Sequence, residues 1–341
     1  MTGKQRNRAF FYRKIGGNDS LSQPELSFSS TEITLDRWGD DQNNTVNLEL
    51  SSAPSSEFVV NLTASDTSVT VSPSQVTFSP GGPISVGITL TGAMTGPNQV
   101  VLTASSNLQT VAPVTLLIQR PSLDIPVLNG LQLWLRSDYG TIGRNGQSGL
   151  TDLNPVAQWR DCSGFGRDLY QGQNGQQPVF RTSSQNGLPG IAFDGLDDML
   201  EFSNTLNLNN FSIYWVGKIL ESPSNGSAYF HGVNGNYAAN HYSMGLYWYQ
   251  GVDIVTGANG SVTQNNPLKI AIYRSGSSWQ YYVNGVSQTV SGNSMQAIIK
   301  GIGRAYTGYS NMVLNEAVIY SRSLTSAERG AINTYLSRWG V

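Results

Sequence analysis

The most constraining feature of this sequence is a pair of short apolar runs separated by a polar loop that opens with Asp-Gly. The runs are residues 191–193 (Ile-Ala-Phe) and 199–202 (Met-Leu-Glu-Phe), and Asp194-Gly195 begins the loop between them. Asp-Gly tolerates the positive φ angles of a tight hairpin turn. Because side chains alternate along a strand, each run would also present one buried face. The sequence therefore predicts two antiparallel strands joined as a hairpin. Asn284-Gly285 predicts a second hairpin, with a type I′ turn leading into Val286.

Three sequence motifs carry a family resemblance. The first is W-x-D-x-S-G-x-G-x-D-L from Trp159, the second is P-x-I-x-F-D-G-x-D-D-x-L from Pro189, and the third is E-x-x-x-Y-x-R-x-L-T-x-x-E from Glu316. Together they resemble laminin-G-like, or concanavalin A-like, jelly-roll domains over roughly residues 123–341. The resemblance implies a jelly-roll fold for this part of the chain and leaves its function open.

The composition indicates an all-β protein with a largely neutral polar surface. Only 12% of the 341 residues are charged and 37 are glycine, which suits many turns. The net charge of −2 argues against a whole-protein nucleic-acid binder, and one cysteine excludes an intramolecular disulfide. No run of 18 apolar residues is present, so no membrane span is expected.

The chain divides into three predicted parts. Residues 1–24 form a basic N-terminal arm, residues 25–121 an immunoglobulin-like β-sandwich of about nine short strands, and residues 122–341 a concanavalin A-like jelly roll. One short C-terminal helix is expected in the last part. Thr325 and Glu328 have the spacing of a capping box, and apolar residues recur at helical spacing as far as Trp339.

The N-terminal arm combines basic and aromatic residues before the first acid at Asp19: Lys4, Arg6, Arg8, Phe10, Phe11, Tyr12, Arg13 and Lys14. Two interpretations stay open, a disordered tail or an anchor that orders on a partner, with aromatics filling pockets and arginines meeting carboxylates. As an anchor the arm would bind a capsid or other virion protein. The arm makes a weak case for nucleic-acid contact.

Catalytic chemistry has no clear motif in this sequence. Glycosidases on a jelly-roll scaffold commonly place their two carboxylates in an E-x-D-x-x-E strand, which the large domain lacks. Asp198 and Glu201 have odd spacing, so they would face opposite ways on a regular strand. His231 and His241 lie in no recognisable triad, and Cys162 has no activating signature. The sequence predicts no catalytic residues and a protein that is not an enzyme.

Three acids around the Asp-Gly loop could bind calcium, since hard cations prefer carboxylate oxygens. They are Asp194, Asp197 and Asp198. Related laminin-G-like domains often carry calcium, but their ligands cannot be matched here. The favoured interpretation is that Asp194 shapes the turn and the others bond loop amides, with no cofactor and no metal required.

The densest aromatic region is the candidate glycan-binding site. It contains Tyr237, Asn240, His241, Tyr242, Tyr247, Trp248 and Tyr249. Aromatic faces pack against the C–H surfaces of sugars, and Asn or His supplies hydrogen bonds. The alternative is that at least half of these residues fill the core of the domain.

The predicted function is that of a non-enzymatic phage virion accessory protein, either a capsid decoration or a fibre-like projection. The arm would anchor it, and the lectin-like domain would be displayed, with host-surface glycan as the ligand. The basic N-terminal stretch is not followed by an apolar segment, so no signal peptide is expected; a virion protein assembled in the host cytoplasm needs none. The alternatives are a cell-surface or secreted glycan-binding adhesin and, third, a carbohydrate-active enzyme.

Overall fold

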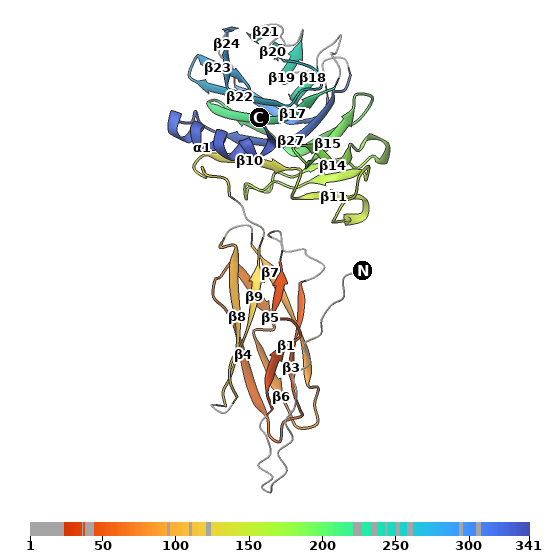
Figure 1. Cartoon of the computed structure of the whole chain (residues 1–341), viewed down its shortest axis with the longest axis vertical. Helices are drawn as coiled ribbons and strands as arrows, with labels where there is room; N and C mark the ends of the chain where they lie inside the picture. Colours follow the sequence, from red (N-terminus) through yellow and green to blue (C-terminus); the bar gives the residue numbers. More distant parts are fainter. Residues whose placement is uncertain are drawn as a thin grey trace. The chain divides into compact units, whose positions relative to one another are not determined.

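A computed structural model describes residues 24–35, 37, 44–93, 96–108, 111–120, 124–220, 227–233, 237–242, 245–249, 253–257, 262–292, 296–304 and 308–341. The chain separates into two compact units, Met1–Ser122 and Leu123–Val341. The prediction of an all-β protein is confirmed, because the described residues form four sheets and a single α-helix (Figure 1). No helix in that part of the chain has the length and hydropathy that crossing a bilayer requires.

The small unit contains a four-stranded and a five-stranded sheet that contribute side chains to one core. Alternation explains this packing: in the run Thr45–Leu50, Val46, Leu48 and Leu50 are buried while Thr45 and Asn47 face water. The four-stranded sheet has the order β1-β3-β7-β5 and the other the order β2-β9-β8-β4-β6. The strands are β1 (Leu26–Phe28), β2 (Glu32–Thr34), β3 (Thr45–Leu50), β4 (Phe58–Ala64), β5 (Val69–Ser72), β6 (Gln75–Phe78), β7 (Ser85–Gly92), β8 (Gln99–Ser106) and β9 (Val114–Gln119).

The large unit is built from an eight-stranded and a ten-stranded sheet (Figure 1). The eight-stranded sheet has the order β14-β15-β27-β17-β22-β23-β24, and β10 also pairs with β27. Its strands are β10 (Leu131–Arg136), β14 (Val179–Gln185), β15 (Leu188–Asp194), β17 (Phe211–Ile219), β22 (Leu268–Ser275), β23 (Ser278–Val283), β24 (Val286–Gln288) and β27 (Asn311–Tyr320).

The ten-stranded sheet has the order β11-β12-β13-β16-β26-β18-β19-β20-β21-β25. Its strands are β11 (Thr141–Gly143), β12 (Val156–Trp159), β13 (Leu169–Tyr170), β16 (Leu200–Leu208), β18 (Ser227–His231), β19 (Tyr237–Tyr242), β20 (Gly245–Tyr249), β21 (Asp253–Gly257), β25 (Val290–Gly292) and β26 (Ala297–Ile302). Two 3-10 turns, η1 (Arg144–Gly146) and η2 (Asn174–Gln176), lie in its loops. One hydrophobic core draws side chains from both sheets.

The predicted Asp-Gly hairpin is wrong. The strand before the loop, β15, pairs with β14 and β27 in the eight-stranded sheet, whereas β16 after the loop pairs with β13 and β26 in the ten-stranded sheet. The loop therefore crosses from one sheet to the other, and the two apolar runs meet in the shared core instead of pairing. Alternation identified the buried face of each run correctly, but it carries no information about which strand lies alongside.

A second hairpin prediction is confirmed. Asn284 and Gly285 join β23 to β24, which pair from Val283–Val286 onward. Their φ angles of 49° and 80° are both positive, as a type I′ turn requires.

The C-terminal helix is confirmed as α1 (Ser326–Leu336), followed by the 3-10 turn η3 (Ser337–Trp339). Its capping box is complete: the Glu328 amide donates to Thr325 Oγ1 at 3.3 Å, and the Thr325 amide donates to Glu328 Oε2 at 2.8 Å. Ile332, Leu336 and Trp339 are fully buried, which fixes the helix to the unit.

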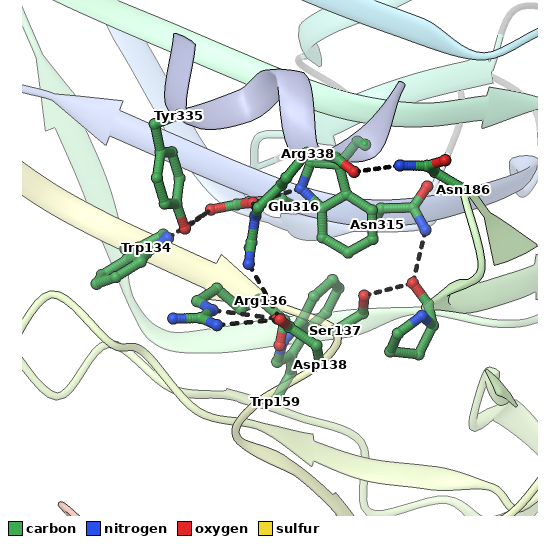
Figure 2. A network of polar contacts seen from close by, with 12 residues as sticks. Trp134, Arg136, Ser137, Asp138, Trp159, Asn186, Asn315, Glu316, Tyr335 and Arg338 are labelled. Atoms are coloured by element: carbon green, nitrogen blue, oxygen red, sulfur yellow. Dashed lines mark hydrogen bonds and ion pairs between the residues drawn. The ribbon is translucent and has the colours of Figure 1, made fainter. Parts of the chain in front are cut away.

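A buried carboxylate in β27 joins this helix to the eight-stranded sheet (Figure 2). Glu316 has no exposed surface, and its Oε1 accepts from Trp134 Nε1 at 2.7 Å and from the Tyr335 hydroxyl at 2.8 Å. Its Oε2 accepts from Trp339 Nε1 at 2.5 Å and from Arg338 Nη2 at 2.6 Å. The first Glu of the third motif therefore has a structural role, because it satisfies donors from β10, α1 and η3 together.

Candidate functional site

The outer face of the ten-stranded sheet carries a continuous cross-strand row of polar and aromatic positions. The residues of this row are register partners on successive strands: Gln158, Tyr170, Glu201, Gly301, His231, Tyr237 and Tyr249. Register partners lie on the same face of a sheet. Their sequence neighbours Leu169, Leu200 and Phe230 belong to the core. The described side chains among them, those of Gln158, Tyr170, Glu201 and His231, do not belong to the core cluster, and we call the seven register positions the outward row.

At the centre of the outward row, a glutamate and a histidine meet above a glycine. Glu201 in β16 and His231 in β18 are both register partners of Gly301 in the intervening strand β26. His231 Nε2 lies 3.1 Å from Glu201 Oε1. A Cβ on residue 301 would clash with the Leu200 carbonyl oxygen and would lie 2.8 Å from His231 Cε1 and 2.9 Å from Glu201 Cα, so only glycine fits between the two strands at this point.

Hydrogen bonding assigns the proton positions of this pair. The Arg304 amide donates to His231 Nδ1 at 3.4 Å, so Nε2 carries the proton and donates it to Glu201. Burial lowers the pKa of His231, which is 2% exposed, and keeps the ring neutral at pH 7. The hydrogen bond from His231 lowers the pKa of Glu201. The pair is therefore an ionised carboxylate held by a neutral imidazole.

Next to this pair, Tyr170 offers an aromatic ring to solvent, with half of the residue exposed. Its hydroxyl donates to Asp168 Oδ2 at 3.2 Å, and Gln158 Nε2 donates to the same oxygen at 2.8 Å. Partial burial and the Asp168 carboxylate raise the pKa of Tyr170, so the hydroxyl stays protonated. This end of the outward row thus presents a fixed ring with hydrogen-bonding groups at its edge.

The loop between β12 and β13 is shaped by a buried aspartate. Asp161 Oδ1 accepts from the amides of Trp134 and Ser163 at 3.0 and 2.9 Å, and Oδ2 accepts from the Arg167 amide at 3.1 Å. The amide of Asp161 in turn donates to Asp168 Oδ1 at 2.9 Å. The Asp and Ser of the first motif therefore fold a loop that ends at Asp168 and Tyr170.

The predicted glycan-binding residues lie on β19 and β20, and two of them, Tyr237 and Tyr249, are positions of the outward row. Register pairs Tyr237 with Tyr249, Asn240 with Tyr247, and Tyr242 with Gly245. His241 is paired with Leu246, and Trp248 is paired with Val255 in β21. Glu201 and His231 were not predicted as a pair, since their register is set by strands 30 residues apart in the sequence.

The three acids of the Asp-Gly loop gather closely enough to be considered as metal ligands. One oxygen from each of Asp194, Asp197 and Asp198 lies within 4.8 Å of the others. Their hydrogen bonds fit the loop-shaping interpretation: Asp194 Oδ1 accepts from the Leu196 amide at 2.8 Å, and Asp198 Oδ2 accepts from the Asp194 amide at 2.9 Å. Burial, with the charges of Asp194 and Asp197, raises the pKa of Asp198 to about 6. A hard cation prefers carboxylate oxygens such as these, but loop amides already donate hydrogen bonds to two of the three carboxylates.

Two other sequence predictions concern single sites. Cys162 is a buried free thiol whose pKa is raised by burial, which leaves it unactivated, as predicted. The predicted anchoring residues of the arm, from Lys4 to Lys14, lie outside the described residues.

Comparison with known proteins finds no matching family model and no matching curated protein. Solved structures do match. A Trypanosoma rangeli sialidase in complex with sialic acid has a TM-score of 0.42 and 13% identity, over 71% of this chain and 43% of its own. A structure from Bacteroides ovatus described as a carbohydrate binding protein has a TM-score of 0.29 and 10% identity, over 91% and 84% of the two chains. A GH54 arabinofuranosidase has a TM-score of 0.41 and 12% identity, over 62% and 60%.

These neighbours are carbohydrate-binding or glycosidase-like proteins. The chain spans less than half the length of the sialidases that it matches first. Identities near 12% transfer no residue and no substrate to this chain, and the jelly-roll and immunoglobulin-like assignments stay predictions. The neighbours give no support to a virion role, which also stays a prediction.

The prediction that the chain is not an enzyme is wrong. It rested on a missing E-x-D-x-x-E strand, yet the matched structures include sialidases and an arabinofuranosidase, which are glycosidases. The lack of one familiar motif therefore does not exclude a carbohydrate-active enzyme.

Proposed function

We propose that the large unit binds carbohydrate on the face of its ten-stranded sheet that carries the outward row. The observation that carries this proposal is the register, which aligns Tyr170, Glu201, Tyr237 and Tyr249 with one another across the sheet. No single segment of the sequence contains this arrangement. It extends the predicted aromatic site on β19 and β20 toward β13 and β16.

The chemistry of the row suits a saccharide. An exposed tyrosine ring offers an apolar face for sugar C–H groups and a polar hydroxyl at its edge. The ionised Glu201 carboxylate accepts hydrogen bonds from hydroxyls, and such charge-assisted bonds are stronger than neutral ones. Gln158 adds an amide beside Tyr170. A few fixed polar groups around an aromatic surface are the usual composition of a ligand site.

The proposal is tested by binding and turnover with the full-length protein. The probes are cellohexaose, xylohexaose, mannohexaose, chitohexaose and sialyllactose. Calorimetry measures their binding, and the release of reducing ends measures their turnover. Tyr170→Ala should weaken the best-bound probe at least tenfold. The matched control is Tyr282→Ala, which removes a tyrosine from β23 in the other sheet and should leave binding unchanged. Absence of binding to every probe, or equal loss in both variants, would contradict the proposal.

A second part of the proposal concerns how the carbohydrate-binding unit is displayed. The basic and aromatic composition of residues 1–24 favours docking of this arm to a capsid or other virion protein, with Phe10, Phe11 and Tyr12 supplying most of the affinity. Docking would place the large unit on the virion surface, facing host glycans. A cell-surface or secreted adhesin is the alternative location for the same binding unit.

Deletion of residues 1–20 distinguishes attachment to a virion through the arm from the cell-surface or secreted location. The variant should keep the melting temperature and the saccharide affinity of the full chain but should no longer co-purify with phage particles. Phe10→Ala with Phe11→Ala should reduce incorporation more than Lys4→Ala, which serves as the matched change. Full occupancy of particles by the arm-deleted protein would place attachment elsewhere.

A further inference from the structure

Glu201 keeps one carboxylate oxygen that accepts from no described residue. Oε1 is bonded to His231, while Oε2 has no hydrogen-bond donor among the residues that the structure describes. The side chain is 31% exposed, whereas that of His231 is 3% exposed. The imidazole is therefore the buried support, and the carboxylate is the group that a ligand in solution can reach.

The support depends on the missing side chain of Gly301. Glu201 and His231 lie on strands that are not adjacent, with β26 between them. Their side chains meet across Gly301 because no Cβ occupies the space above that residue. The Arg304 amide fixes the other nitrogen of the imidazole at 3.4 Å, so the ring is held from both sides. This arrangement sets the direction in which Oε2 faces.

The Glu201 carboxylate itself disfavours an acidic group on its free oxygen. The hydrogen bond from His231, with the positive charges of Lys300 and Arg304, lowers the pKa of Glu201 and keeps it ionised. The Lys300 ammonium group also donates to the backbone carbonyls of Phe202 and Ser203. A sugar carboxylate in contact with Oε2 would face a like charge, whereas sugar hydroxyls would donate to it.

We propose that Glu201 Oε2 accepts hydrogen bonds from the hydroxyls of a neutral saccharide, and that His231 is a positioning residue acting through the gap at Gly301. This inference rests on the proposed carbohydrate binding and names the sugar class and the recognising atom. It predicts that neutral hexasaccharides bind at least tenfold more tightly than sialyllactose, unlike the sialic acid ligand of the sialidase that the chain resembles.

The experiment compares four variants of the full-length protein on the best-bound neutral hexasaccharide. Glu201→Gln should weaken binding at least tenfold. His231→Ala should weaken it severalfold, and His231→Gln should recover part of the loss because its amide can donate to Oε1. Gly301→Ala should weaken binding at least as much as His231→Ala, since the new Cβ would lie 2.8 Å from His231 Cε1, would clash with the Leu200 carbonyl oxygen and would displace both.

A pH profile separates positioning from a merely structural role. Binding by the wild type should fall on the acid side as Glu201 takes up a proton. In His231→Ala the acid limb should move to higher pH, because the hydrogen bond that stabilises the carboxylate is gone. If this variant does not fold, the carbon-13 titration of the Glu201 carboxyl in His231→Gln and wild type supplies the same comparison.

The possible outcomes are distinct. Binding that is lost in Tyr170→Ala but unchanged in Glu201→Gln would overturn this inference and keep the proposed function. Tighter binding of sialyllactose than of every neutral probe would also overturn it. Absence of binding by the wild type would overturn both.

Discussion

Glu316 and Glu201 are two glutamates of the large unit that accept hydrogen bonds from aromatic ring nitrogens, and the comparison between them separates structure from function. Glu316 lies in β27 with no exposed surface and accepts from Trp134, Trp339, Tyr335 and Arg338. Glu201 lies in β16, is partly exposed and accepts only from His231 among the described residues.

The difference lies in how much hydrogen-bonding capacity each carboxylate has left. A carboxylate can accept about four hydrogen bonds. Glu316 uses that capacity within the fold, so it fastens α1 and η3 to the sheet (Figure 2) and offers nothing to a ligand. Glu201 keeps one oxygen without a donor among the described residues, on a side chain that is 31% exposed. An ionised group that is positioned but unsaturated is a better functional candidate than a buried one with a complete set of partners.

The largest expected effect comes from Glu316→Gln. The amide would place a donor against donors and leave Arg338 without its closest carboxylate, which should cost about 3 kcal/mol. For a unit of this size the melting temperature should fall by about 6–12 °C. The matched change Glu201→Gln should cost less than about 1 kcal/mol, because the group is partly exposed. Calorimetry measures both melting temperatures. Equal losses of stability in the two variants would contradict the distinction between a structural Glu316 and a functional Glu201.

An intermediate effect is expected at Asp198, which is buried but lies beside other acids. Its pKa is raised from 3.8 to about 6, so the folded state binds the proton more tightly than the unfolded chain does. The contribution of Asp198 to the free energy of unfolding is therefore fully present below pH 4. It is lost as the pH rises through 6 and stays absent above that. Asp198→Asn should stabilise the protein at pH 8 by about 1–3 kcal/mol. The gain should shrink toward pH 4, and a gain independent of pH would contradict this ionisation.

The smallest effect is expected from calcium. Asp194 and Asp198 already accept loop amides, so addition of 2 mM calcium, or its removal by a chelator, should shift the melting temperature by less than about 2 °C. A rise above about 5 °C that disappears in Asp198→Asn would show instead that the three acids hold a cation.

Local features of the fold could be predicted from the sequence because they depend on neighbouring residues. The capping box at Thr325 and the Asn284-Gly285 turn are set within four residues, and both are confirmed. The Asp194-Gly195 hairpin was predicted on the same kind of signal and is wrong, because that loop changes sheets. Turn chemistry shows where a chain bends and leaves the destination of the next strand open.

The candidate site could be predicted only in part. Aromatic density drew attention to Tyr237 and Tyr249, but their alignment with Glu201 depends on register across β26 and β18. Long-range register arises from packing of the whole sheet and has no local signature. One available signal was Gly301 within an apolar strand pattern, since a glycine there often marks close approach of another group.

The position of β27 in the sequence governs when the large unit can form. This strand lies between β15 and β17 and also pairs with β10, and Trp134 meets Glu316 across 182 residues of chain. During synthesis β10 and β15 are made long before the strand that joins them, so the edges that pair with β27 stay unpaired while the intervening chain emerges. The longest such delay in the small unit, between β2 and β9, spans fewer residues. The nascent large unit is therefore the part of this protein with most need of a chaperone.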